Sequence, residues 1–306
     1  MKLLAAAALA TLSLTGAATA RPKVGGCTVF PATNAWNQRV DRLPVAGNSA
    51  QLIASIGNSG VHADFGNGLY DGSRIGIPYV VVHGTKTPKS RVTFDYADES
   101  DKGPYPIPAG VPIEGQPAHG NEGDRHALIV DRDACRLYEL YALHREGGHW
   151  AAGSGAIFNL RSNALRPAGW TSADAAGLPI LPGLARWDGD ASTGAIRHAL
   201  RFTVERTRRA FVYPARHYAS DSTDPSLPPM GLRVRLKASV DISKLPQQAR
   251  IVAQAMKSYG MILADNGSNW YVSGAPSPKW SNDQLHALGG LTGSDFEVVD
   301  TSSLHP

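Results

Sequence analysis

The chain has 306 residues, of which 42% are apolar and 18% charged, a balance typical of a folded protein and not of a disordered one. Its 32 glycines and 21 prolines argue against a bundle of long helices and favour many short strands joined by tight turns. The formal net charge is only +4, and basic residues alternate with acidic ones, which argues against a nucleic-acid-binding surface.

Residues 1–20 have the organisation of a secretory signal peptide. Lys2 precedes an apolar run over 3–14, and a site of small residues precedes Arg21. The apolar run is shorter than the roughly 20 residues that span a bilayer, and no later run is longer. We therefore expect a secreted chain of residues 21–306, periplasmic or extracellular, that does not enter the membrane.

The chain contains two cysteines, Cys27 and Cys135. In an oxidising compartment this pair favours a disulfide, and the absence of a CxxC spacing argues against a metal or redox role. A bridge closing a loop of about 109 residues would stabilise the fold by about 4 to 5 kcal/mol in the chain-entropy model.

The first elements predicted along the chain are one helix and two strands. Residues 48–57 begin with polar capping residues, carry an apolar stripe and end at Gly57, which predicts a short helix. The β-branched and aromatic runs over 77–84 and 91–97 predict strands.

Residues 98–124 are rich in proline and glycine and show no periodicity, which predicts a long loop. Loops of this length in compact domains are more often functional than idle. We therefore expect this loop to form a wall or lid of a binding cleft.

Two hairpins are predicted after the loop. The first covers 126–143, and its alternation places Leu137, Glu139 and Tyr141 on one face of the second arm. The second joins 196–204 to 210–216. Further strands are expected at 156–160, 233–239, 261–265, 270–274 and 295–300, and helices at 246–259 and 283–290.

About nine or ten short strands with two or three short helices predict an all-β fold, namely a β-sandwich or a jelly-roll-like arrangement with long loops. The sequence contains no internal repeat and no linker. Residues 21–306 are therefore expected to form a single β-rich domain, and we expect a monomer.

The sequence lacks the usual signatures of nucleotide, zinc and calcium sites, and it has no GxSxG nucleophile motif. We therefore expect no cofactor and no metal. The pairs His62 with Asp64 and Asp124 with His126 have two-residue spacings that place both side chains on one face of a strand. Separate hydrogen-bonded groups are the preferred interpretation of both pairs, ahead of metal ligation.

Asp174 is the first candidate catalytic residue. It is the one acidic group in an apolar, proline-rich stretch over 165–184, next to Trp170. Desolvation would raise the pKa of its carboxyl toward the range of a general acid at neutral pH. The alternative is that Asp174 caps a short helix in this stretch.

His198 and His217 form the second candidate group. In the predicted hairpin, His198 could meet Arg216 or His217 across the strand ladder, with Tyr218 beside them. The alternative for His198 is a structural role in the core of the sheet.

Asp265 is the third candidate, because it ends a predicted strand at the turn sequence Asp265-Asn266-Gly267. Trp270 follows closely and offers a flat apolar face to a ligand. A plain turn without chemistry is the alternative.

Four runs, over 27–37, 169–184, 198–204 and 259–276, resemble a group of secreted bacterial proteins. They include CTVFPATNAWN, GWTSADAAGLPILPGL and YGMILADNGSNWYVSGAP. The resemblance covers nearly the whole chain after residue 20. It implies export and a single domain, and it carries no activity onto these residues.

Export, β-rich structure, six Trp and ten Tyr, and carboxyl groups in apolar settings favour a protein that binds polysaccharide or cell-wall glycan. We expect a glycoside hydrolase, which needs two carboxyl groups about 5 to 9.5 Å apart. Asp174 and Asp265 are the first pair, with Glu114 and Asp101 in reserve.

Two other functions stay open. A polysaccharide lyase would use a His or Tyr base and an Arg beside a uronate carboxylate, and a third reading is a non-catalytic glycan- or cell-wall-binding protein. The predicted catalytic residues are Asp174, Asp265, His198 and His217, and the predicted substrate-binding residues are Trp170, Arg216, Tyr218, Trp270 and Glu114.

Overall fold

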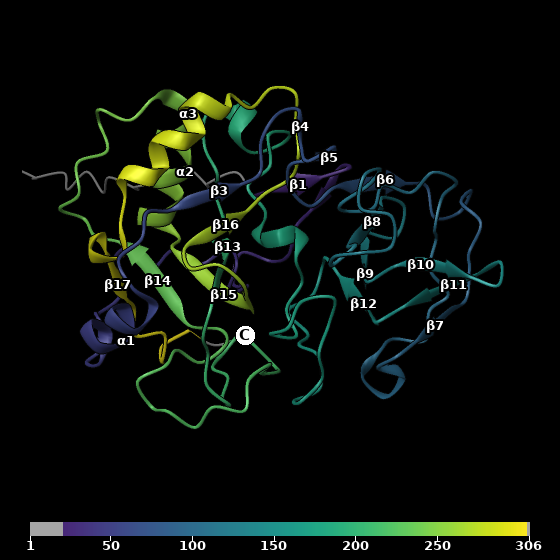
Figure 1. The fold of residues 1–306 in the computed structure, drawn as a ribbon, viewed down its shortest axis with the longest axis horizontal. Helices are drawn as coiled ribbons and strands as arrows, with labels where there is room; N and C mark the ends of the chain where they lie inside the picture. Colours follow the sequence, from purple (N-terminus) through teal and green to yellow (C-terminus); the bar gives the residue numbers. More distant parts are fainter. Residues whose placement is uncertain (1–20, 305–306) are drawn as a thin grey trace, which may run out of the picture.

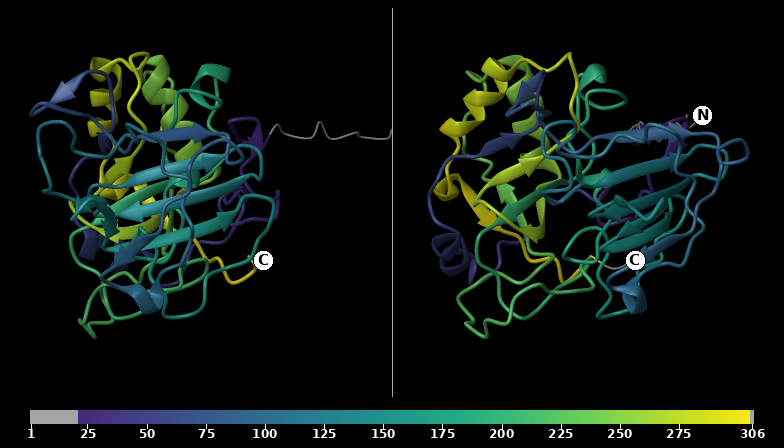
Figure 2. Two further views of the ribbon diagram at one scale, coloured as in Figure 1. Left: turned by 90° about the vertical axis from the view of Figure 1, so that its right-hand side faces the viewer. Right: turned by 45° about the vertical axis from the view of Figure 1, so that its right-hand side comes forward.

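The computed structural model describes residues 21–304, so the predicted signal peptide lies outside the described residues. Figure 1 shows two groups of sheets side by side, one with the largest sheet and the helices, the other with two smaller sheets. The right view of Figure 2 shows the same division from a further direction, and in the left view the second group lies in front of the first. None of the described helices is long and apolar enough to cross a membrane.

The largest sheet has six strands in the order β17-β14-β15-β13-β16-β3. β13 runs parallel to β15 and β16 runs parallel to β3, whereas the other pairs are antiparallel. The strands are β3 (His62–Asp64), β13 (Leu200–Val204), β14 (Arg233–Leu236), β15 (Met261–Asn266), β16 (Tyr271–Ser273) and β17 (Phe296–Val298).

The helices lie in the same group as the six-stranded sheet (Figure 1). The predicted helices are confirmed as α1 (Ser49–Ile56), α2 (Gln247–Ser258) and the short α3 (Asn282–His286). α2 packs against β14 and α3. Single 3-10 turns occur at η1 (Ala97–Glu99), η2 (Leu181–Gly183), η3 (Ala191–Thr193), η4 (Ala287–Gly290) and η5 (Gly293–Asp295).

The second group contains a four-stranded sheet in the order β12-β9-β8-β6 and a three-stranded sheet in the order β10-β11-β7. The strands are β6 (Tyr79–Val82), β7 (Val92–Phe94), β8 (Ala127–Asp131), β9 (Arg136–Tyr141), β10 (His144–Glu146), β11 (His149–Ala152) and β12 (Ser154–Asn159). Two small hairpins complete the list, β1 (Lys23–Val24) with β2 (Cys27–Thr28), and β4 (Leu69–Tyr70) with β5 (Ser73–Arg74).

The four-stranded sheet is buried on both faces. Leu128 and Leu137 point into the main core with the six-stranded sheet, whereas Ile129 and Leu140 point into a second core. This is the expected period-two alternation, and the predicted hairpin of β8 and β9 is confirmed.

The predicted long loop is confirmed, and its first part is a structural layer. Residues of this loop fill the second core against the outer face of the four-stranded sheet, namely Tyr105, Ile107, Val111 and Ile113. Because this part is anchored by apolar packing, the rest of the loop is held at the edge of the sheet where the candidate site lies.

The expectation of a sheet-rich fold is confirmed, but a sandwich is not. Each of the three larger sheets contains a parallel pair, β13 with β15, β6 with β8 and β11 with β7. Parallel pairs need crossover connections, whereas hairpins alone would give antiparallel neighbours.

The hairpin predicted from 196–204 and 210–216 is wrong. β13 already has β15 on one edge and β16 on the other, so no edge is free for a following strand. The segment 210–216 makes only an isolated bridge, between Phe211 and Met230, and Pro214 has no N–H to donate to a ladder.

The predicted disulfide is confirmed between Cys27 in β2 and Cys135 directly before β9, with Cα atoms 5.6 Å apart. It ties the N-terminal segment to the four-stranded sheet across 108 positions of sequence.

The double variant Cys27→Ala with Cys135→Ala should lower the free energy of unfolding by about 2 to 4 kcal/mol, because the unfolded chain is no longer cross-linked. Urea denaturation of the variant and of the oxidised wild type measures the difference. Reducing agent should destabilise the wild type and leave the variant unchanged. Equal stability of variant and wild type would contradict a stabilising role.

Glu139 is a fully buried carboxyl group on the main-core face of β9. Its oxygens accept hydrogen bonds from the backbone N–H groups of Ile180 and Leu181 at 2.9 Å, at the start of η2. Burial raises the pKa of Glu139 to about 7, although the two backbone donors favour the anion. The folded state therefore keeps this carboxyl protonated at pH values where the unfolded chain has lost the proton.

Because the pKa is raised in the folded state, the contribution of Glu139 to stability is full below pH 4.5 and is lost as the pH rises through about 7. Glu139→Gln stays neutral, and its amide oxygen can accept both backbone hydrogen bonds. We expect the variant to gain up to about 3 kcal/mol relative to wild type between pH 5 and 8. Urea denaturation across this range tests it, with Glu146→Gln on exposed β10 as control. If the difference in stability between Glu139→Gln and wild type does not change with pH, the pKa of Glu139 is not raised in the folded state.

Candidate active site

A cleft of about 420 Å³ lies where β9, β12 and β15 meet the long loop. Tyr141 ends β9, Ser154 begins β12 and Asp265 lies near the end of β15. The loop contributes further lining residues, so its predicted position beside a cleft agrees with the structure. The ionisable lining residues other than tyrosine are Glu99, Asp124, Asp174, His217 and Asp265.

Asp174 and Arg201 form a buried bidentate ion pair. Arg201 in β13 donates from Nε and Nη2 to the two oxygens of Asp174, at 2.8 and 2.7 Å. Its Nη1 donates to Ser273 Oγ in β16 at 2.6 Å. The Asp174 side chain is 0% exposed, so it is desolvated as predicted, but its oxygens face Arg201 and not a substrate. No helix forms at 172–178, so Asp174 is not a helix cap either.

Asp265 accepts a hydrogen bond from the same guanidinium. Arg201 Nη2 lies 3.1 Å from Asp265 Oδ2, and the Asp265 side chain is 23% exposed. Burial and the negative charge of Asp174 raise the pKa of Asp265 to about 7, against the opposing effect of Arg201. Arg201 thus donates hydrogen bonds to two carboxyl groups. Of these, Asp265 reaches the cleft, and its raised pKa keeps it protonated up to nearly neutral pH.

His126 lies directly before β8 and is almost fully buried. Its Nδ1 lies 2.5 Å from Glu114 Oε2 and its Nε2 lies 3.0 Å from the carbonyl oxygen of Ala173. Both ring nitrogens therefore face acceptors, which favours the doubly protonated ring. Burial opposes the charge, but the Glu114 carboxylate outweighs it and raises the pKa of His126 to about 9. In return, His126 lowers the pKa of Glu114 despite the burial of that carboxyl.

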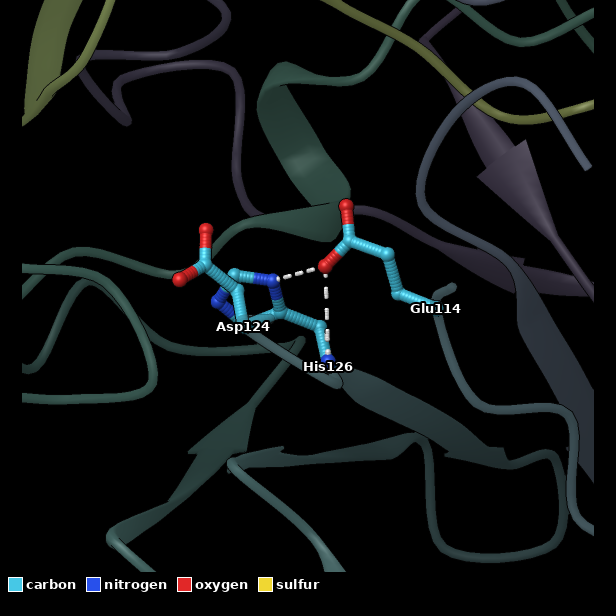
Figure 3. A group of neighbouring side chains, drawn as sticks. All are labelled: Glu114, Asp124 and His126. Atoms are coloured by element: carbon cyan, nitrogen blue, oxygen red, sulfur yellow. Dashed lines mark hydrogen bonds and ion pairs between the residues drawn. The ribbon is translucent and has the colours of Figure 1, made fainter. Parts of the chain in front are cut away.

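Glu114 and Asp124 lie on either side of the His126 ring (Figure 3). Among the described residues they form the one group of three such side chains close enough to share a metal ion, with ligand atoms within 4.8 Å of one another. A metal at this place would have to displace the proton between His126 Nδ1 and Glu114. The Nε2 contact with Ala173 would then orient the ring from behind.

His217 lines the cleft opposite Glu99. Its Nδ1 lies 2.8 Å from the carbonyl oxygen of Ala175, and its Nε2 lies 4.0 Å from Glu99 Oε2. Glu99 in η1 also accepts a hydrogen bond from the backbone of Thr171 at 2.8 Å. Residues 171–175 form one wall of the cleft. Through Glu99, the long loop contacts this wall at the Thr171 backbone and the neighbouring His217.

The structure brings together three of the four predicted catalytic residues, Asp174, His217 and Asp265, but not His198. His198 is 0% exposed, and its Nε2 lies 3.2 Å from Asp190 in a buried cluster with Arg186. The predicted meeting of His198 and His217 depended on a hairpin that does not exist.

Trp270 is also not in the cleft. Its ring is fully buried between Phe202 and Phe296, with centroids 5.9 and 4.9 Å away, and its Nε1 donates to the carbonyl oxygen of Gly57. A ring packed on both faces has no surface to offer a sugar.

None of the other predicted binding residues lines the cleft. Glu114 lies behind the cleft, bonded to His126. Trp170, Arg216 and Tyr218 do not line the cleft. Trp170 lies against Arg166, the Nε of Arg216 donates to the Arg166 carbonyl, and Tyr218 contacts Arg209. The reserve carboxyl Asp101 is bound to Arg166 as well.

Sequence reasoning missed the roles of Arg201, Glu99 and Asp124. Arg201 was detectable from the strand pattern, since a charged residue alternates there with Leu200 and Phe202. The two-residue spacing of Asp124 and His126 was a weak signal for a shared site. Nothing local in the sequence indicates that Glu99 faces His217.

Comparison of the chain with protein-family models, with curated proteins and with solved structures gives no match.

Asp174→Asn should lower the pKa of Asp265, because it removes a negative charge and leaves Arg201 to pair with Asp265 alone. It should also destabilise the fold by about 3 kcal/mol, since a buried ion pair loses one partner. NMR titration of carboxyl-labelled aspartate measures the pKa, with Asp188→Asn as an exposed control. An unchanged pKa of Asp265 would show that the two carboxyl groups do not share Arg201 in solution.

Proposed function

We propose that the protein is a secreted glycoside hydrolase in which Asp265 is the general acid and Asp124 is the ionised partner carboxylate. The observation that carries the proposal is the Asp265 carboxyl group, which is partly exposed in a cleft and has a pKa of about 7. A general acid with a pKa near the working pH is what protonation of a glycosidic oxygen requires.

Asp124 replaces Asp174 as the second carboxyl group of the proposal. Asp124 is exposed and lines the same cleft, whereas the Asp174 side chain is enclosed with Arg201. The charge of Asp124 contributes to the raised pKa of Asp265, so the two groups are near enough to interact. Two carboxyl groups with different environments, one partly buried beside Arg201 with a raised pKa and one exposed, support the division into acid and nucleophile or base.

Tyrosine side chains support a sugar as the ligand. Tyr96 and Tyr141 line the cleft, and Tyr96 is 54% exposed. Aromatic rings of this kind pack on the apolar faces of sugar rings. Export is part of the proposal and is supported by the pattern of residues 1–20 and by the Cys27–Cys135 disulfide.

The lyase alternative has less support than the hydrolase. A lyase needs a cation or an amide to neutralise the uronate carboxylate, and the described lining residues include the amide of Asn266 but no Lys or Arg side chain. Arg201 lies behind the lining and already has three acceptors, in Asp174, Asp265 and Ser273. The non-catalytic alternative predicts glycan binding without turnover.

Wild-type protein should release reducing ends from a member of a broad glycan panel, with a rate that falls above about pH 7 as Asp265 loses its proton. Asp265→Asn should lower kcat by about 10² or more, and Asp188→Asn should leave it unchanged. A product that absorbs in the ultraviolet would indicate a lyase instead. If both variants still bind glycan and no glycan is cleaved, the proposal that the protein is an enzyme is wrong.

A further inference from the structure

The charge of the cleft is opposite to that of the chain. The whole chain carries a formal net charge of +4, yet four lining residues, Glu99, Asp124, Asp174 and Asp265, are acidic, and no lining residue is Lys or Arg. The cleft is thus a negative depression on a protein with a basic excess.

The cations near the cleft are already engaged. Arg201 is shared by Asp174 and Asp265, and His126 is bonded to Glu114. Both cations are buried behind the lining and do not face the open space. Five carboxyl groups, those of the four lining residues and Glu114, thus stand against these two cations and the imidazole of His217, which lies 4.0 Å from Glu99. Even with Asp265 protonated and His217 counted as a cation, at least one negative charge remains in excess.

The solvent-accessible part of this excess negative charge is the carboxylate of Asp124. It is exposed, and its carboxylate lies within 4.8 Å of the His126 ring without a hydrogen bond to any described residue. Asp265 and Glu99, by contrast, each have a donor, in Arg201 and in the Thr171 backbone. Among the lining carboxylates, Asp124 is therefore the one that can still accept a hydrogen bond from a ligand in the cleft.

This arrangement distinguishes three classes of glycan. A uronate polymer would bring more negative charge into a negative cleft, which electrostatics opposes. A neutral glycan would gain nothing from the unpaired charge. A glycan with protonated amino groups would supply the missing cation and form a charge-assisted hydrogen bond.

We propose that the cleft binds a polysaccharide that carries free amino groups, such as a polymer of unacetylated hexosamine, and that Asp124 pairs with the ammonium group of one sugar. This inference rests on the proposed function in taking a glycan as the ligand. It adds the class of substrate, and the exposed ring of Tyr96 supplies the apolar contact that a sugar needs beside its charge.

The test compares binding of two hexamers that differ only in the amino group, a β-1,4-linked glucosamine hexamer and its N-acetylated counterpart. Calorimetry at pH 5.5 uses full-length Asp265→Asn protein, which prevents turnover and matches the neutral Asp265 carboxyl at that pH. We expect the amino hexamer to bind at least about tenfold more tightly at low salt, with an advantage that shrinks at high salt because the ion pair is screened.

Asp124→Asn, in the same Asp265→Asn background, should abolish most of the preference for the amino hexamer over the acetylated hexamer. Asp188→Asn is the matched control, since it removes one exposed carboxylate outside the cleft. Equal or tighter binding of the acetylated hexamer would overturn the inference. If neither glucosamine hexamer binds, a galactosamine polymer is compared with its acetylated form. The lack of a preference for the amino form would then also overturn the inference.

The outcomes separate this inference from the proposed function. Cleavage of neutral glycans without a preference for amino groups would retain the hydrolase and overturn the inference. A salt-sensitive preference that depends on Asp124, in a protein that cleaves no glycan, would retain the inference and overturn the hydrolase.

Discussion

The site depends on the hydrogen bonds and ion pairs that the Arg201 guanidinium makes. It joins Asp174 from the 171–175 wall, Asp265 from β15 and Ser273 from β16, while its own backbone lies in β13. A single cation in a low-dielectric setting cannot fully compensate two carboxylates, so one of the two retains a proton. Asp174 has the bidentate contact and no exposure, whereas Asp265 has a single contact and reaches the cleft, and its pKa is raised to about 7.

The layers of the fold explain why such a polar group can be buried at all. The four-stranded sheet is covered on one face by the six-stranded sheet and on the other by the long loop. Glu139 and His126 therefore lie between layers, where each needs partners, and each has them in backbone groups or Glu114. Burial raises the pKa of Glu139, whereas the Glu114 carboxylate raises the pKa of His126 against the effect of burial.

Local features of the sequence were sufficient for the helices, the β8–β9 hairpin and the disulfide. Helix ends were set by nearby residues such as Pro246 and Gly57, and the alternation in β9 placed Glu139 on the correct face. The compartment inferred from residues 1–20 indicated the pairing of the two cysteines. Each of these depends on residues close in sequence or on a choice between few partners.

Features that depend on distant partners were not predictable. The hairpin over 196–216 failed because the edges of β13 are taken by strands more than 50 residues later in the chain. Trp270 looked available beside a turn, but Phe202 and Phe296 enclose it from elsewhere in the sequence. Asp174 was correctly identified as desolvated, whereas its partner Arg201 lies in another predicted element, so the ion pair between them was not predictable.

The short wall over 171–175 is held from three directions, since His126 contacts the Ala173 carbonyl, Arg201 holds the Asp174 carboxylate and His217 contacts the Ala175 carbonyl. These three anchors belong to different parts of the fold, so the two groups of sheets cannot hinge apart without breaking charged contacts. A ligand in the cleft would therefore meet a backbone that these contacts already hold in place, and the backbone would have little conformational entropy left to lose on binding.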